Sequence, residues 1–283
     1  MTMLSINTNI GALNASQSTY SANKSMETSM ARLSSGKRIN SGADDAAGLF
    51  ITKRMATEIQ GLNQAVRNAA DAQAYLATTE GAMEEIHTML LRIRELAVQG
   101  SNGTYTAQDR QAFRAEIYDL QKEIDRISTD TTWNNNGLLS GAASNGITFQ
   151  LGADNTQTMT VSIANANTAN LSLASNGTLS ATAGALTSAA SLMVYISTID
   201  SAISTISTRR GTYAAAMNRL DHAIANMENV ATNLSVAKGR IEDADFAAET
   251  TNLTKSQILS QAATSMLAQA NASKQNLLAL LQG

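Results

Sequence analysis

The feature that most constrains the fold is a long, unbroken seam of apolar residues between Leu192 and Leu234. Apolar residues recur there every three or four positions, the spacing of a coiled-coil helix, and only Arg210 places a charge on the seam. The seam consists of Leu192, Ile196, Ile199, Ile203, Ile206, Tyr213, Met217, Leu220, Ile224, Met227, Ala231 and Leu234. At about 1.5 Å per residue this helix would be roughly 60 Å long. A rod of that length needs other helices to cover its apolar side.

The composition suits such rods and excludes several kinds of chemistry. The 283-residue chain has no proline, which would cost about 3 kcal/mol inside a helix. It has no cysteine, so disulfides, thiolate metal sites and cysteine nucleophiles are excluded. Nucleic-acid binding is not expected, because the net charge is −3 and there is no basic block. Membrane insertion is not expected either, because no run of about 18 apolar residues occurs.

Two more rods are predicted before the middle of the chain. Residues 66–97 and 113–127 repeat the three-and-four spacing. Between them, the glycine- and asparagine-rich residues 99–105 indicate a turn, and Thr106 with Asp109 has the spacing of a capping box. Because the turn is short, these rods should be antiparallel neighbours.

The region from Ser128 to about Leu186 lacks the helical three-and-four spacing of the preceding segments. Alternating apolar residues over 147–151 and 159–163, separated by a polar turn, predict a β-hairpin. Residues 164–187 are rich in small polar residues, so a loop is expected. The predicted fold class is therefore mainly α: a long antiparallel helical bundle with a small β-hairpin.

The two chain ends both predict amphipathic but polar helices. Residues 1–34 have helical spacing, and a last rod is expected to begin within residues 239–246. Neither helix can bury its apolar stripe alone, because short polar helices need a tertiary partner. We expect the ends to pair with each other and with other copies. A contact between two different surfaces of successive copies gives an open filament unless a ring closes.

Acidic residues near the predicted helix starts favour capping over cation binding. Asp44 and Asp45 precede one helix, and Glu242, Asp243 and Asp245 precede the last. Neither group has the alternating oxygen ligands of a calcium loop. The candidate N-cap residues of the first group are Asn40, Ser41 and Asp44.

No motif in the sequence predicts catalysis. His87 and His222 are the only histidines, and neither belongs to a zinc motif. Glu84 and Glu85 are adjacent on a helix and so do not face each other as an acid–base pair would. We therefore expect no enzyme, no metal and no cofactor.

Several segments resemble the bacterial flagellins. These are SINTNIGALNA (5–15), MARLSSGKRINSGADDAAGL (30–49), LLRIRELAVQGSNGTYT (90–106) and residues 218–271, and together the resemblance covers roughly 1–140 and 190–283. It implies a structural protein that polymerises into the flagellar filament used for swimming. The short middle region implies a filament without large outer domains.

The resemblance also implies a domain organisation. Residues 1–42 and 239–283 would form an inner coiled-coil domain that drives polymerisation, and 43–140 and 186–238 a helical rod. Residues 141–185 would add the hairpin and a short variable loop. The residues expected to pack in the inner core are Ile6, Ile10, Leu13, Leu259, Met266, Leu277 and Leu280.

Export and partners follow from the same resemblance. Residues 1–23 lack Lys, Arg and a continuous apolar block, so an ordinary signal peptide is not expected and bulk evidence alone suggests the cytoplasm. Flagellins instead leave unfolded through the flagellar type III export apparatus, with a chaperone on the C-terminal segment (about 250–283), and fold under a cap protein beyond the hook–filament junction protein. The expected location is extracellular, in the flagellar filament.

The resemblance maps an epitope of the flagellin-sensing Toll-like receptor onto Arg92, Leu96 and Glu116, which are also expected to make subunit contacts. From the residues alone, Arg92 and Glu116 are helix-surface charges and Leu96 is a seam residue.

Three alternatives remain at this point. A hook–filament junction protein has similar chain ends, although the RIRELAVQ and SQAATSMLAQAN stretches favour a flagellin. An enzyme-bearing flagellin would need H-E-x-x-H, which is absent. A secreted adhesin would need a patterned exposed domain that the short middle cannot house.

Overall fold

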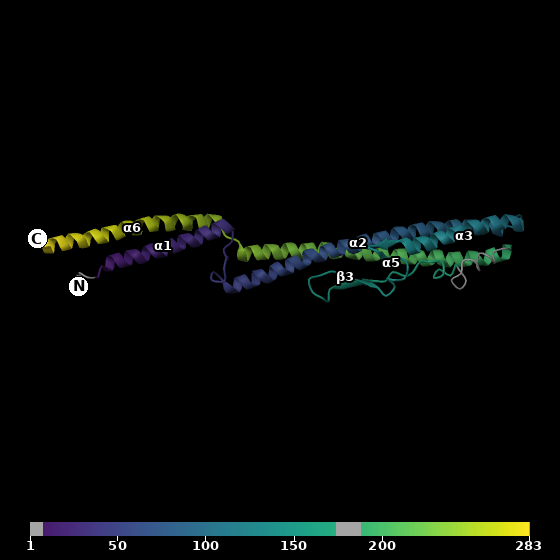
Figure 1. Ribbon diagram of the computed structural model, residues 1–283, viewed down its shortest axis with the longest axis horizontal. Helices are drawn as coiled ribbons and strands as arrows, with labels where there is room; N and C mark the ends of the chain where they lie inside the picture. The colour runs from purple at the N-terminus through teal and green to yellow at the C-terminus, as the bar shows by residue number, and fades with distance from the viewer. Residues whose placement is uncertain (1–7, 174–187, 283) are drawn as a thin grey trace. The chain divides into compact units, whose positions relative to one another are not determined.

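The computed structural model describes residues 8–173 and 188–282 and is mainly helical, as predicted (Figure 1). Its helices are α1 (Ile10–Ser35), α2 (Ala46–Ser101), α3 (Ala107–Asp130), α5 (Ala189–Glu242) and α6 (Phe246–Gln282). The chain forms two compact units, which are residues 1–57 with 232–283 and residues 58–231. Helices α2 and α5 contribute to both units.

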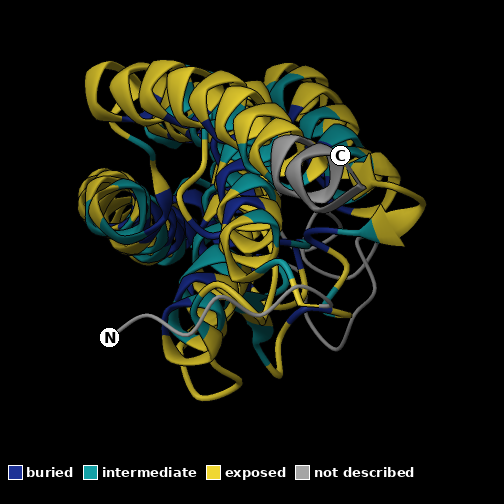
Figure 2. Ribbon diagram, turned by 90° about the vertical axis from the view of Figure 1, so that its left-hand side faces the viewer, coloured by how far each residue is buried: buried dark blue, intermediate teal, exposed yellow. Residues whose placement is uncertain are grey.

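The unit of residues 58–231 has a core of large apolar side chains. In Figure 2 the helices carry buried residues on one side and exposed residues on the other. The predicted seam of α2 is confirmed from Leu76 to Ile93, where its large members are fully buried, whereas Val66 at its start is half-buried. The largest fully buried residues of this unit include Leu76, Met83, Ile86, Leu90, Ile93, Leu96, Ile117, Ile124 and Tyr213. On α5, Tyr195 and Ala202 are buried beside the predicted seam, since the helix is covered on more than one side and its apolar stripe is correspondingly broad.

The charge on the predicted seam, Arg210, is explained by an ion-pair site. Its guanidinium lies 2.7 Å from a carboxylate oxygen of Glu80 and also contacts Glu84. Arg94 pairs with Asp200 across the same two helices at 2.6 Å. The contacts of α2 and α5 thus run in opposite sequence directions, so the two helices are antiparallel.

The turn between α2 and α3 confirms the predicted capping box. The Thr106 hydroxyl accepts from the backbone N–H of Asp109 at 3.3 Å, and the Asp109 carboxylate accepts from the Thr106 N–H at 2.9 Å. Helix α2 continues to Ser101, so the turn begins later than residue 99.

Two small antiparallel hairpins follow α3. Strands β1 (Thr132–Trp133) and β2 (Asn136–Gly137) are joined through Asn134 and Asn135, both with left-handed φ. Strands β3 (Ile147–Gln150) and β4 (Thr158–Val161) confirm the predicted hairpin. Its turn lies close against α2, where a Cβ on Gly61 would come within 2.9 Å of Ala153.

The described part of the predicted loop, residues 164–173, is packed rather than loose. Leu171 and Leu173 are buried, and Asp125 on α3 accepts from the backbone N–H and hydroxyl of Thr168. The remaining residues of the predicted loop, 174–187, lie outside the described residues.

One helix of the described chain could cross a membrane by length and composition alone. The most apolar window of α5 has a mean hydropathy of 1.3. A single helix of this kind is weak evidence, because a core helix of a helical bundle passes the same test. The expectation that the chain does not insert into membranes stays a prediction.

Candidate assembly surface

Helices α1 and α6 pair along a seam of small side chains. They are antiparallel, since Asn9 donates to the carbonyl of Ala270 at 3.1 Å and Ser260 donates to Asn23 at 2.8 Å. The residues buried along the pair are spaced seven apart on each helix. They are Ala15, Ala22 and Ser29 on α1 and Glu249, Ser256 and Ala263 on α6. Small side chains at these heptad positions let the two backbones approach closely, but they bury little apolar area.

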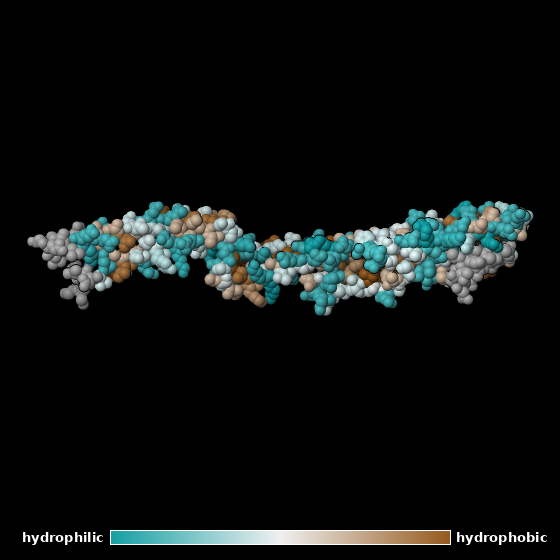
Figure 3. Space-filling view, in the orientation of Figure 1, coloured by the Kyte–Doolittle hydropathy of each residue, from teal (hydrophilic) through white to brown (hydrophobic). Residues whose placement is uncertain are grey.

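The large apolar residues of this pair face outward, as Figure 3 shows in brown over α1 and α6. Among the predicted core residues, Ile10 is 59% exposed, Leu13 61%, Leu259 49% and Met266 63%. A single chain therefore does not bury them. Ile6 lies outside the described residues, as do the side chains of Leu277 and Leu280. Their packing in an assembly stays a prediction.

A groove of about 780 Å³ runs along the pair. It is bounded on α6 by Leu259 and Met266 and on α1 mainly by glycine, asparagine and serine residues. The lining positions repeat every three or four residues on both helices, as in a second coiled-coil seam. Those that follow this spacing are Gly11, Asn14, Ser18, Ser21 and Ser25 on α1 and Leu259, Ala262, Met266, Gln269 and Ser273 on α6. The other lining residues are Ala15, Ala22, Ser256, Ala263 and Ala270, most of which belong to the buried small-residue seam. The groove therefore has the pattern that receives a further helix.

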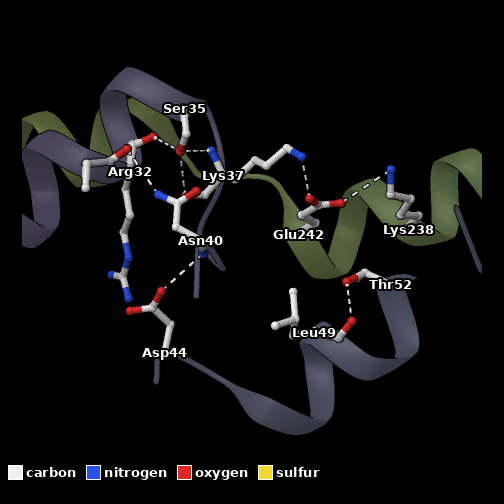
Figure 4. A network of polar contacts seen from close by, with 10 residues as sticks. Arg32, Ser35, Lys37, Asn40, Asp44, Leu49, Thr52, Lys238 and Glu242 are labelled. Atoms are coloured by element: carbon white, nitrogen blue, oxygen red, sulfur yellow. Dashed lines mark hydrogen bonds and ion pairs between the residues drawn. The ribbon is translucent and has the colours of Figure 1, made fainter. Parts of the chain in front are cut away.

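A polar joint connects the pair to α2 and α5 within the same unit (Figure 4). Gly36 ends α1 with a left-handed φ of 70°. Its carbonyl accepts from Ala244, and the Arg38 N–H donates to the carbonyl of Glu242, which makes a short antiparallel bridge between the two connections. Ile39, 2% exposed, anchors this joint by packing on Gly48.

The joint corrects the predicted N-cap of α2. Asp45, not Asn40, Ser41 or Asp44, caps α2 by accepting from the N–H of Gly48 at 2.9 Å. Asp44 instead accepts from the N–H groups of Asn40 and Ser41 and folds the loop. These hydrogen bonds hold the Asp44 pKa below its usual value.

The last rod does not begin at residue 239. Helix α5 continues to Glu242, because nothing in that stretch stops the helix, and Asp245 caps α6 by accepting from the N–H of Ala247 at 2.8 Å. Glu242 therefore ends a helix, where it lies 2.6 Å from Lys37 and 3.5 Å from Lys238. The hydrogen bond from Lys37, with the charge of Lys238, lowers the Glu242 pKa.

The predicted receptor residues lie on the other unit. Arg92 on α2 and Glu116 on α3 form an exposed ion pair at 2.8 Å, and Arg92 also pairs with Glu95. Leu96 is only 1% exposed. The structure thus brings Arg92 and Glu116 together at the surface and places Leu96 in the core.

Sequence reasoning missed the small-residue seam. It assigned large apolar residues to the contact between the chain ends, whereas the ends meet through alanine, serine and Glu249. The signal was present as a seven-residue repeat of small residues in α1 and α6. The described residues contain no cluster of three His, Cys, Asp or Glu side chains that could hold a metal ion.

Comparison with known proteins places both helical halves in one family. The description "Bacterial flagellin N-terminal helical region" matches residues 6–144, and "Bacterial flagellin C-terminal helical region" matches residues 196–281.

Relatives match along the whole chain. Flagellin of Bacillus subtilis is 38% identical over 98% of this chain and 99% of its own length. Flagellin FlaB2 of Treponema pallidum is 36% identical with the same coverage. A putative flagellar hook-associated protein from Vibrio parahaemolyticus, 16% identical, covers 71% of this chain and 100% of its own with a TM-score of 0.60, which shows a shared fold. The two regional matches and the full-length relatives show that this chain belongs to the bacterial flagellin family.

Proposed function

We propose that this protein self-assembles into the helical bacterial flagellar filament and that assembly buries the outward apolar faces of α1 and α6. Membership of the flagellin family makes the chain a structural protein of the filament, which is extracellular, and not an enzyme. The proposal concerns how its subunits meet.

The exposure of Leu259 and Met266 beside the groove is the observation that carries this proposal. Isolated exposed apolar residues are ordinary on protein surfaces, whereas apolar residues gathered along a helix-sized groove indicate an interaction site. Burying each of them would contribute on the order of 1 kcal/mol or more.

The occupant of the groove is a helix from another copy. Both walls repeat at coiled-coil spacing, and the chain itself supplies long helices with apolar outer faces. Because the groove and the surface that enters it are different, the contact is heterologous and propagates into a filament.

The domain assignment remains part of the proposal. Residues 1–42 and 239–283 form the polymerisation core, 43–140 and 186–238 the rod, and 141–185 the hairpin with its variable loop. The pairing of α1 with α6 supports this division.

Export as an unfolded chain is the second part of the proposal. The type III export apparatus carries the chain out, a chaperone covers residues 250–283 beforehand, and the cap and hook–filament junction proteins contact the filament. The small-residue seam of α1 and α6 supports this sequence of events. It stabilises the pair little, so these helices gain most of their stability only after neighbours cover them.

The Toll-like receptor of the host is proposed to contact the surface around Arg92 and Glu116. Their exposed ion pair supports this, whereas Leu96 acts from beneath by packing α2. Arg92→Ala should then lower the response of receptor-bearing reporter cells. The control is Arg126→Ala, which removes an exposed ion-pairing arginine elsewhere on α3.

A hook–filament junction protein is not favoured. The hook-associated protein shares only the fold at 16% identity, whereas the relatives that match nearly the full length at 36–38% are flagellins.

Seeded elongation tests the proposal. Purified subunits are added to short filament seeds, and growth is followed by negative-stain electron microscopy. Wild type should extend the seeds, and Leu259→Gln with Met266→Gln should not, because the groove wall becomes polar. Val194→Gln changes an exposed apolar residue on α5, away from the groove and from Arg92, and serves as the control.

Two results would overturn the proposal. One is a wild-type protein that stays monomeric on seeds, and the other is a groove variant that elongates at the wild-type rate. Deleting residues 250–283 offers a coarser test: the shortened protein should stay soluble and form no filaments.

A further inference from the structure

A second, polar pocket of about 420 Å³ adjoins the apolar groove. It is lined by Ser25, Thr28, Ser29 and Arg32 of α1 and by Glu249, Asn252, Lys255, Ser256 and Leu259 of α6. We call it the Arg32 pocket. It lies wholly within one compact unit and shares Ser25, Ser256 and Leu259 with the groove.

Arg32 has donors that its own chain leaves unused. The guanidinium carries five N–H groups. One of its terminal nitrogens lies 3.8 Å from a carboxylate oxygen of Glu249, a long ion pair, and the buried Nε has no hydrogen-bond partner among the described residues. A buried donor without an acceptor is destabilising. The terminal N–H groups of Arg32 make no hydrogen bond among the described residues, so they, rather than the enclosed Nε, offer donors to one more acceptor in the pocket.

Charge makes that acceptor an anion. Lys255 is exposed at the pocket and forms no ion pair within the described residues. Glu249 is the only carboxylate in the lining, against the two cations Arg32 and Lys255. Asp44 lies outside the lining. Its carboxylate accepts from the N–H groups of Asn40 and Ser41 and also interacts electrostatically with Arg32, so it offsets part of the positive charge.

One other carboxylate exists on the paired helices, and it is unused. Among the residues of α1 and α6, the acidic ones are Glu27 and Glu249. Glu27 is exposed and makes no ion pair within the described chain. It is level with Lys255 along the pair, because the contacts Asn23–Ser260 and Arg32–Glu249 lie on either side of it.

Glu27 does not face the pocket of its own copy. It lies five positions from Arg32, which is about 140° around the helix at about 100° per residue. Glu27 is exposed and lies on the side of α1 away from the buried Ser29. Glu27 therefore points away from the Arg32 pocket of its own copy, but it can reach the same pocket on another copy.

We propose that Glu27 of one copy enters the Arg32 pocket of a second copy, where its carboxylate accepts from Arg32 and Lys255. This inference rests on the proposed assembly. It deepens that proposal by naming a charged contact that orients one subunit on the next. Two different surfaces meet, as an open filament requires.

A charge-swap cycle tests the contact. A variant subunit added to a wild-type seed would meet the wild-type partner residue. Each variant is therefore grown on sonicated fragments of its own filaments. Where these are lacking, growth is started by salt-induced nucleation. Glu27→Lys and Lys255→Glu should each slow elongation about tenfold or more, because each places like charges together. The double variant should elongate faster than either single variant, since positions 27 and 255 again carry opposite charges, although Arg32 still repels the new lysine and full recovery is not expected. Both side chains are exposed, so circular dichroism should show unchanged helix content.

Lys53→Glu is the matched control, because it reverses an exposed lysine of the same unit outside the pocket. It should elongate at close to the wild-type rate. If wild type assembles and the single variants do so equally well, or if the double variant is as slow as the singles together, the contact does not exist and the proposed function still stands. If wild type itself fails to assemble, both proposals fail.

Discussion

The unit of residues 58–231 and the α1/α6 pair are built from similar long helices but bury different side chains. In the larger unit, fully buried leucine, isoleucine and methionine fill the space between α2, α3 and α5. In the α1/α6 pair, alanine, serine and one glutamate lie inside while Ile10, Leu13 and Met266 face outward. A helix bundle that keeps its large apolar residues inside is stable by itself. A pair that turns them outward is suited to gain stability from neighbours.

The largest effect should come from truncating a buried side chain in the larger unit. Leu90→Ala removes a fully buried leucine and should lower the free energy of unfolding by about 2–5 kcal/mol. Chemical denaturation followed by circular dichroism measures it. Leu91→Ala alters the next residue, which is 47% exposed, and should change the free energy by less than about 0.5 kcal/mol. Equal losses in both variants would show that this unit is not a packed core.

The α1/α6 pair should respond to the opposite change. Ala22→Leu puts a large side chain into the small-residue seam and should destabilise the pair by about 1–3 kcal/mol, because the helices must separate. Hydrogen exchange of the α1 amides reports this locally. Ala31→Leu, an exposed position of the same helix, should leave exchange unchanged. Faster exchange in both variants, or in neither, would contradict the claim that the α1/α6 pair depends on its small-residue seam.

The smallest expected effect is the loss of stability of the polar joint at acidic pH. The hydrogen bond from Lys37 lowers the Glu242 pKa below its ordinary 4.5. A lowered folded-state pKa stabilises the fold above the unfolded pKa, and this contribution is lost as the pH falls through the folded pKa. Exchange of the Arg38 amide, corrected for intrinsic rates, should therefore accelerate only below pH 4.5.

Glu242→Gln provides the control for that acid response. It removes the charge at every pH, so its Arg38 exchange should be somewhat fast already at neutral pH and should lose the acid-dependent step. An unchanged acid response in this variant would assign the effect to another carboxylate.

The sequence predicted what depends on local periodicity. The rod beginning at Leu192, the capping box of Thr106 and Asp109, and the β3–β4 hairpin each follow from a spacing that a few neighbouring residues determine. The flagellin resemblance, carried by the conspicuous segments at both ends, is confirmed by the full-length relatives.

The sequence did not predict what depends on competition between neighbouring signals. Residues 239–242 can continue α5 or open α6, and the continuation prevails, so Glu242 ends a helix. The seam of Ala22 and Ser256 was overlooked because small residues give a weak hydrophobic signal, although they decide how closely two helices approach. The pocket at Arg32 combines residues more than two hundred positions apart, and no local pattern reveals it.

Oxidative footprinting of methionines would test the central claim most directly. Soluble subunits and seeded filaments are treated with the same dose of hydroxyl radicals, and oxidation is quantified at each methionine by mass spectrometry. Met266, 63% exposed in the single chain, should be oxidised in the subunit and strongly protected in the filament. The fully buried Met83 should stay protected in both states. A Met266 that is oxidised equally in subunit and filament would contradict the claim that assembly buries the outward face of α6.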